Sequence, residues 1–332
     1  MNNMEYEQHQ HESEPTENFP SEAGAKDNKK DLFLPLSILA SALLIASAFV
    51  YVGNQRAAGS QTVFTAKGSS ATTTQEAASV SALQEKVIPA NGVTLPARWG
   101  DLGKQLVSAG VIDEPQFVAL YAQRGGLPPD MKALLDDADN GNLVITPQNS
   151  GVLLNLLWAL GLGNNNPILT SGPMENPQYG GAQNFASTGG WTLSVGDAMT
   201  HYSAHSFITL TTGQQALVDR VAQNIYRPCC GNSTYFPDCN HGMAMLGLLE
   251  LMASQGVSES DMYKAALTVN SYWFPDTYMT LATYFQSQGV DWSTVDPKTV
   301  LGAAYSSAQG YQQIEKKITP VQTQSSGGCG VQ

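Results

Sequence analysis

The chain has 332 residues, enough for one large or two medium domains, and a formal net charge of −12. Residues 1–31 carry 8 acidic and 3 basic side chains, a net charge of −5, which leaves −7 for the rest. This acidity argues against nucleic acid and anionic lipid surfaces as partners of the remaining chain. The sequence contains no P-loop, hydrolase elbow or Cys-x-x-Cys pair, so it identifies no reaction and leaves open whether the protein is an enzyme.

The N-terminal part of the chain has the pattern of a membrane-anchored protein. Residues 1–31 are acidic and poor in apolar side chains, which predicts a disordered tail. Residues 32–53 contain no charge and are long enough to cross a lipid bilayer as a helix. A cleaved signal peptide is the alternative, because Ala46-Ser47-Ala48 resembles a cleavage site. Lysines just before this segment predict a single-pass protein of the cell membrane, with a cytoplasmic N-terminus and an extracytoplasmic bulk.

The composition beyond the predicted anchor changes twice. Residues 54–89 are rich in Ala, Ser, Thr and Gln, which is typical of a flexible stalk. Residues 90–318 have the apolar periodicity of a mainly α globular domain. Residues 319–332, which include Cys329, are predicted to be a mobile tail.

Helical periodicity dominates the predicted domain in chain order. The expected helices are Arg98–Ala109, Glu114–Gln123, one opened by Pro128 and Pro129, the apolar GVLLNLLWALGLG after Thr146-Pro147, Gln214–Tyr226, His241–Gln255, Met262–Trp273, and two that begin at Pro275 and Pro297, the latter being the last. Residues 164–195 are rich in Gly, Asn and Pro and are expected to be irregular. Only Leu143–Thr146 suggests a strand.

Three of the four cysteines and three of the five histidines lie between residues 201 and 241. These residue types bind zinc, copper and iron. Cys239 directly precedes a predicted helix, where free N–H groups and the helix dipole stabilise a thiolate, and Arg227 adds to this effect. The sequence therefore predicts a site for a transition metal ion, copper, zinc or iron, with the candidate ligands Cys229, Cys230, Cys239 and His241.

His201 and His205 are the second choice of metal ligands. Their spacing places both imidazoles on one face of a helix, if a helix forms there, and such a pair can bind one divalent ion.

Two other functions fit the same cysteines. In an oxidising compartment, a disulfide from Cys239 to Cys229 or Cys230 would pin the loop of a structural or protein-interaction module whose partner the sequence does not identify. A thiol oxidoreductase would instead use Cys239 together with Cys329.

Three short stretches carry a resemblance to a known family: Pro228-Cys229-Cys230-Gly231, Asp238-Cys239, and Gln255-Gly256-Val257-Ser258. Over about residues 228–274 the chain resembles bacterial extracytoplasmic proteins named for a PCYCGC motif, although the central Cys-x-Cys-Gly-Cys order is missing. The resemblance implies a membrane-tethered protein with a site centred on cysteine, in a family whose function is obscure.

Overall fold

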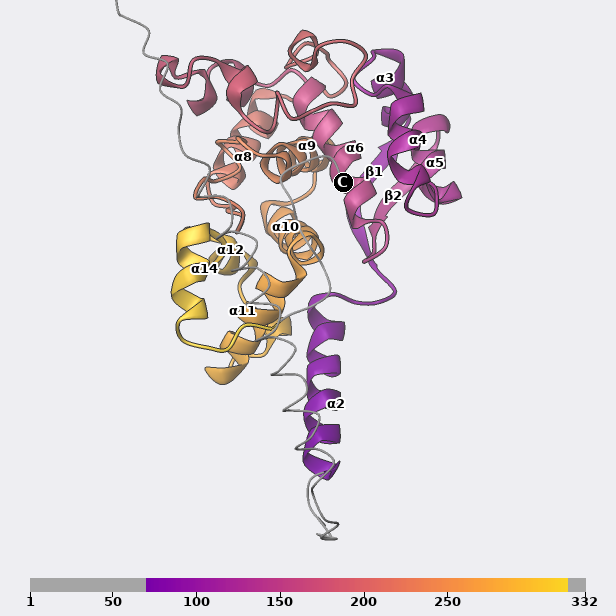
Figure 1. Cartoon of the computed structure of the whole chain (residues 1–332). Coiled ribbons are helices and arrows are strands. Elements are labelled where there is room, and N and C mark those ends of the chain that lie inside the picture. The colour runs from indigo at the N-terminus through magenta and orange to yellow at the C-terminus, as the bar shows by residue number, and fades with distance from the viewer. Residues whose placement is uncertain (1–69, 322–332) are drawn as a thin grey trace, which may run out of the picture. The chain divides into compact units, whose positions relative to one another are not determined.

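Two nearly uncharged helices form the centre of the computed structural model, which describes residues 70–321. They are α6 (Ser150–Gly163) and α9 (Asn240–Ser254), and almost every residue of both is buried. Figure 1 shows α6 and α9 side by side, with other helices around them. A helix that is apolar on all sides has no face for solvent, so these two helices form the core that the others cover.

Two glycines let α6 and α9 touch through their backbones. A Cβ atom added to Gly161 would lie 2.1 Å from the carbonyl oxygen of Met243. A Cβ atom added to Gly247 would lie 2.5 Å from the carbonyl oxygen of Leu157. Since no larger residue fits at either position, the crossing of the two helices is fixed, and with it the place where α9 begins.

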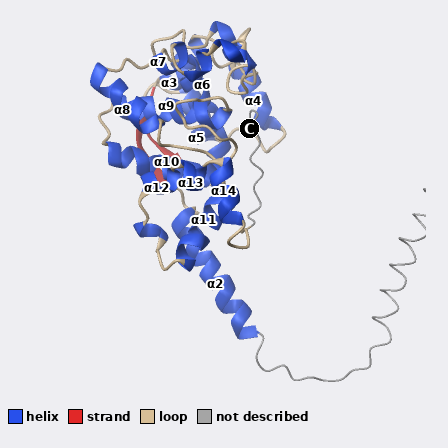
Figure 2. Ribbon diagram, turned by 90° about the vertical axis from the view of Figure 1, so that its left-hand side faces the viewer, coloured by secondary structure: helices blue, strands red, loops and turns tan. Residues whose placement is uncertain are grey.

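Some of the remaining helices pack against this pair and others against one another, and Figure 2 shows the two short strands among them. The α-helices are α2 (Ser70–Val87), α3 (Leu102–Ser108), α4 (Glu114–Ala122), α5 (Pro129–Asp136), α7 (Pro167–Thr170), α8 (Thr212–Ala222), α10 (Glu259–Trp273), α11 (Pro275–Ser287), α12 (Pro297–Leu301), α13 (Ala303–Ser306) and α14 (Ala308–Glu315). Short 3-10 helices span Pro173–Glu175, Pro177–Tyr179, Ala182–Asn184, Ala198–Thr200 and Trp292–Thr294. The mainly α fold is therefore confirmed for the described residues.

A small antiparallel sheet joins β1 (Val93–Gly100) to β2 (Asn140–Ile145). Alternate residues of β1 are buried, namely Leu95, Ala97 and Trp99. The prediction of a helix from Arg98 was therefore wrong at its start, because Arg98 lies in β1 and α3 begins only at Leu102. The expected strand at Leu143–Thr146 is confirmed, although it begins earlier and ends at Ile145.

Most predicted helix ends are close to the observed ones. Thr211 caps α8 in a capping box, and the Ser258 side chain accepts a hydrogen bond from the backbone of Asp261 at the start of α10. Helix α6 was predicted to begin at Pro147, with Thr146 as its N-cap, and begins instead at Ser150. There the side chains of Thr146 and Asn149 each accept a hydrogen bond from the other's backbone N–H, which closes a turn before the helix.

Two further predictions need correction at their boundaries. Residues 70–87, predicted to belong to a flexible stalk, form α2, and its residues Leu83 and Val87 are buried in the core. The helix at Pro297 is not the last one, because α13 and α14 follow it.

Several predictions lie outside the described residues. These are the acidic tail 1–31, the anchor 32–53, the first part of the stalk, and the C-terminal segment that contains Cys329. Within residues 70–321, no helix combines the length and apolar character needed to cross a bilayer.

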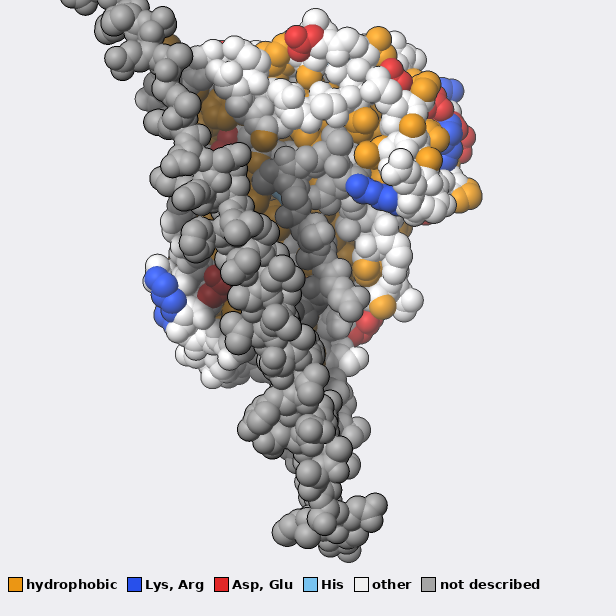
Figure 3. Space-filling view, viewed as in Figure 1, with side chains coloured by type: hydrophobic (Ala, Val, Ile, Leu, Met, Phe, Trp, Pro, Cys, Tyr) orange, Lys and Arg blue, Asp and Glu red, His pale blue; other side chains and the backbone are white. Residues whose placement is uncertain are grey.

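On the part of the surface that Figure 3 leaves visible, charged side chains of opposite sign gather where α3, α4 and α5 lie. There Lys132 of α5 forms ion pairs with Glu114 and Asp136, at 2.5 and 2.6 Å. All three side chains are about one-third exposed or more, so these ion pairs contribute little to stability.

Candidate metal centre

The segment 225–239 folds back on itself in front of α9. The backbone N–H of Thr234 donates to the carbonyl oxygen of Ile225 at 2.8 Å, and an isolated antiparallel bridge joins Tyr226 to Ser233. A second contact comes from the start of α14, where the N–H of Ala308 donates to the carbonyl oxygen of Cys230 at 2.9 Å. We call residues 225–239 the cysteine loop, because its turn carries Cys229 and Cys230.

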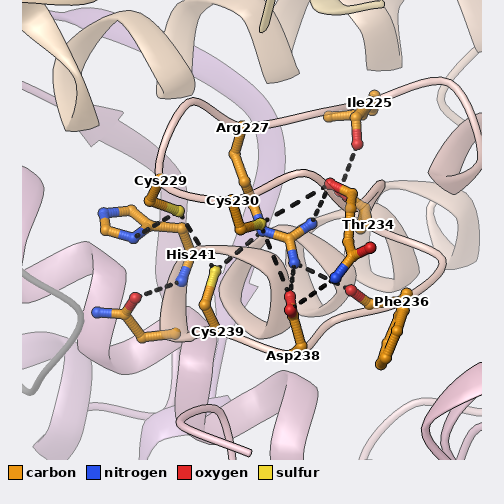
Figure 4. A network of polar contacts seen from close by, with 11 residues as sticks. Ile225, Arg227, Cys229, Cys230, Thr234, Phe236, Asp238, Cys239 and His241 are labelled. Carbon is orange, nitrogen blue, oxygen red and sulfur yellow. Dashed lines mark hydrogen bonds and ion pairs between the residues drawn. The ribbon is translucent and has the colours of Figure 1, made fainter. Parts of the chain in front are cut away.

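Three of the predicted ligands come together between the cysteine loop and the first turn of α9 (Figure 4). Cys239 is the N-cap of α9 and His241 lies in its first turn, so the helix holds both side chains. The Sγ atoms of Cys229 and Cys239 are 3.5 Å apart, and Cys229 Sγ lies 4.0 Å from His241 Nδ1. The three ligand atoms all lie within 4.8 Å of one another. Among the described residues, Cys229, Cys230 and Cys239 form no disulfide bond.

Arg227 is the buried cation of the site, with an exposure of 1%. Its Nε donates to Cys239 Sγ at 2.9 Å, and its terminal nitrogens donate to Asp238 Oδ1 and to the carbonyl oxygens of Asn232 and Phe236. The guanidinium thus compensates the charge of Cys239 and ties the two sides of the loop together (Figure 4).

Gly242 makes room for this guanidinium. A Cβ atom added to Gly242, in the first turn of α9, would lie 2.5 Å from Cζ of Arg227. The arginine therefore packs directly against the helix backbone beside Cys239.

The environment separates the thiols by their acidity. Hydrogen bonds from Cys229 and Cys230, aided by the charge of Arg227, lower the pKa of Cys239 well below its usual value despite its burial. The bond with Cys229 lowers the pKa of Cys230, but the bond with Cys239 and burial outweigh it and raise this pKa to about 12. Of these two thiols, Cys239 is therefore the one that ionises more readily, whereas Cys230 stays protonated at neutral pH.

His241 is held as a neutral imidazole. Burial lowers its pKa, against the opposing effect of Cys239. Its Nδ1 faces Cys229, and its Nε2 is buried without a hydrogen-bond partner. The ring lies against Phe274 and Trp273, with centroids 4.3 and 5.6 Å apart. A neutral imidazole with Nδ1 directed at the sulfurs is in the form that binds metal ions.

The fourth predicted ligand, Cys230, lies on the other side of Cys239. Its Sγ is 3.7 Å from Asp238 Oδ1, and these atoms form a second group with Cys239 Sγ in which all lie within 4.8 Å of one another. Sequence reasoning did not select Asp238 as a site residue, although it directly precedes Cys239. Asn232 was also missed, and its side chain donates to Asp238 Oδ2 at 2.7 Å.

His201 and His205 contact each other but do not join the cysteines. His201 Nδ1 lies 3.1 Å from His205 Nε2, and the two rings stack. The α-helix assumed for them does not form, because a 3-10 helix ends at Thr200 and a turn follows. Neither histidine belongs to a group of three close metal-binding side chains among the described residues.

Glu250 is a second buried ionisable group on α9, and sequence reasoning missed it as well. It is fully buried and accepts hydrogen bonds from the amides of Asn164 and Asn166, at 3.0 and 2.5 Å. Burial raises its pKa to about 8, although both hydrogen bonds act in the opposite direction. The only signal in the sequence is a single acidic residue within the apolar run of α9.

A surface pocket of about 480 Å³ lies away from the cysteine loop. It opens between Asn165, the segment 206–212 and the exposed side of α8, where Gln215 and Asp219 line it. No cysteine or histidine is among its lining residues, so the ligand chemistry and this pocket are separate features.

The chain matches no known protein family, and no curated protein or solved structure is significantly similar to it. The resemblance to the PCYCGC-motif proteins thus stays a prediction.

Proposed function

We propose that this protein binds a transition metal ion through Cys229 Sγ, Cys239 Sγ and His241 Nδ1. The observation that carries the proposal is the approach of these three atoms to within 4.8 Å of one another around a stabilised thiolate. A tetrahedral ion that binds sulfur at about 2.3 Å separates two sulfur ligands by about 3.8 Å. The distance between Cys229 Sγ and Cys239 Sγ, 3.5 Å, is close to this value.

The donor set limits the kind of ion. Two thiolates and an imidazole favour zinc, copper or iron over magnesium and calcium, which prefer oxygen ligands. Arg227 supports the site from outside the ligand set, because its hydrogen bond to Cys239 Sγ orients the sulfur and balances its charge.

We further propose that the site lies on the extracytoplasmic side of a membrane, to which residues 32–53 anchor the chain. The uncharged run and the lysines before it support this orientation. Fractionation of the full-length chain tests the anchor, since an anchored protein stays with the membranes at alkaline pH whereas a cleaved one is released.

Elemental analysis of the full-length chain, purified anaerobically without chelator or added metal, tests the metal site. We expect near-stoichiometric zinc, copper or iron in the wild type and its loss in Cys239→Ser and His241→Ala. His205→Ala is the matched control and should keep its metal. The proposal fails if both site variants retain the wild-type metal content, or if the wild type binds none of these ions after reconstitution.

The same geometry supports one alternative, a thiol oxidoreductase. The lowered pKa of Cys239 and the 3.5 Å between its Sγ and that of Cys229 favour thiol–disulfide exchange at this pair. This function predicts a metal-free protein in which Cys239 is alkylated faster than a free thiol below pH 8. An alkylation rate no faster than that of a free thiol between pH 5 and 9 would count against it.

A further inference from the structure

Cys239 Sγ belongs to two groups of potential ligands. One group contains Cys229 and His241, and the other contains Cys230 and Asp238. We call them the inner group and the outer group. Because they share one sulfur, an ion can pass from one group to the other without leaving Cys239.

The two groups differ in their exposure. In the inner group, His241 and Cys239 are only 1% and 5% exposed. In the outer group, Cys230 and Asp238 are both partly exposed, and only the shared Cys239 is buried. Solvent therefore reaches more of the outer group than of the inner one.

The outer group should also bind a cation more weakly than the inner group. Both carboxylate oxygens of Asp238 already accept hydrogen bonds, Oδ1 from Arg227 and Oδ2 from Asn232. An ion bound there would compete with a buried guanidinium and lie beside its positive charge. The inner group carries no such competition at His241 Nδ1, which faces the sulfur of Cys229.

From this arrangement we infer that Cys230 and Asp238 form a relay position through which the metal ion enters and leaves the inner group. The inference rests on the proposed metal-binding function and adds to it a route by which the bound ion is transferred. As the ion moves outward, its bonds to Cys229 and His241 break and bonds to Cys230 Sγ and an Asp238 oxygen form. The thiol proton of Cys230 passes to water, the bond to Cys239 persists, and no electrons are exchanged.

Transfer kinetics of the zinc-loaded full-length chain test the relay. Stopped-flow transfer to a chromogenic chelator gives the release rate, mixing the apo chain with zinc gives the loading rate, and competition gives the affinity. A residue that the ion meets only in transit changes both rates equally and leaves their ratio unchanged. In Cys230→Ser we therefore expect loading and release to slow by about tenfold, with an affinity within about threefold of the wild type.

Any outcome other than equal slowing at an unchanged affinity contradicts the relay. Unchanged rates in Cys230→Ser would mean that the ion bypasses this thiol, and a loss of affinity would make Cys230 a permanent ligand. Asp238→Asn, which keeps an oxygen to accept the hydrogen bond from Arg227, should slow both rates in the same direction and serves if Cys230→Ser does not fold. His205→Ala, at a residue outside both ligand groups, is the control with wild-type rates. If the wild type binds no zinc, copper or iron at all, the proposed function itself fails, whereas unaltered kinetics in a zinc-binding protein overturn only the relay.

Discussion

Two buried acidic side chains lie at helix α9, Cys239 at its N-cap and Glu250 near its other end, and their pKa values shift in opposite directions. Cys239 lies beside the guanidinium of Arg227, and its pKa is well below the usual value. Glu250 is bonded to two neutral amides, and its pKa rises to about 8.

The comparison separates the effect of burial on the pKa of an acid from the effect of a compensating charge. Burial alone disfavours the charged form of an acid, as at Glu250, even when hydrogen bonds satisfy both oxygens. Hydrogen bonds from two neighbouring thiols, aided by a buried cation, reverse this effect at Cys239. A buried acid on an apolar helix thus becomes a stable anion, and a potential metal ligand, where a second segment brings hydrogen-bond donors and a countercharge.

Removal of that countercharge should give the largest effect. Arg227→Met leaves Cys239 and Asp238 without their cation and deletes four donors that hold the cysteine loop. We expect the free energy of unfolding to fall by about 3–5 kcal/mol, measured by chemical denaturation. Arg98→Met is the control, because the pair of Arg98 with Asp139 is exposed and should contribute less than about 1 kcal/mol. Equal losses in the two variants would contradict the role assigned to Arg227.

The second effect concerns Glu250 and the pH dependence of stability. Its pKa is about 8 in the folded protein and near 4.5 in the unfolded chain, so between these values the folded state holds a proton that the unfolded state releases. The stabilisation is fully present below pH 4.5 and is lost as pH rises to about 8, a change on the order of 4 kcal/mol.

Denaturation at a series of pH values measures this slope. Glu250→Gln should flatten it between pH 5 and 8, whereas Glu85→Gln, on an exposed position of α2, should keep the wild-type slope. A slope that survives in Glu250→Gln would assign the pH dependence to other groups.

A smaller change should follow from one methyl group beside the arginine. In Gly242→Ala the new Cβ would lie 2.5 Å from Arg227 Cζ, so the guanidinium must move away from Cys239. We expect the pH midpoint for alkylation of Cys239, followed by peptide mass spectrometry, to rise by about one pH unit. Gly213→Ala is the matched helical control, since a Cβ atom there meets no other atom within 4 Å. An unchanged midpoint in Gly242→Ala would show that Arg227 does not set the acidity of this thiol.

The smallest effect is expected at the histidine pair. His205→Ala loses one contact with His201 Nδ1, at 3.1 Å, and should cost about 1 kcal/mol or less. Its metal content should equal that of the wild type, because His205 lies outside both ligand groups around Cys239. A loss of metal as large as in His241→Ala would require a ligand set that reaches the histidine pair.

The sequence predicted a helix well where the apolar pattern lies within the helical segment itself. The apolar runs of α6 and α9 both correspond to observed helices. Strand β1 was missed because only three buried residues carry its alternation and Pro96 lies between two of them. Its pairing partner β2 also comes from a distant segment.

The site was predictable only in part, for a similar reason. Clustering in the sequence selected Cys229, Cys239 and His241, and the position of Cys239 before a helix indicated a thiolate. The roles of Asp238 and Asn232 depend on how the loop folds onto Arg227, which no spacing reveals. The pair His201 and His205 shows the converse, because helical spacing suggested a metal site where a turn forms.

The contact between Gly161 and Gly247 has a consequence for how the site adapts to ions of different radius. Because this backbone contact holds α9 against α6, α9 cannot shift along its own axis. Cys239 and His241 therefore keep their positions relative to α6. Crystal structures with a small and a large ion should differ in the cysteine loop and agree in α9. Residues 225–239 would then adjust to the radius of the proposed ion, so the range of ions that the site can hold would depend on a turn rather than on a helix.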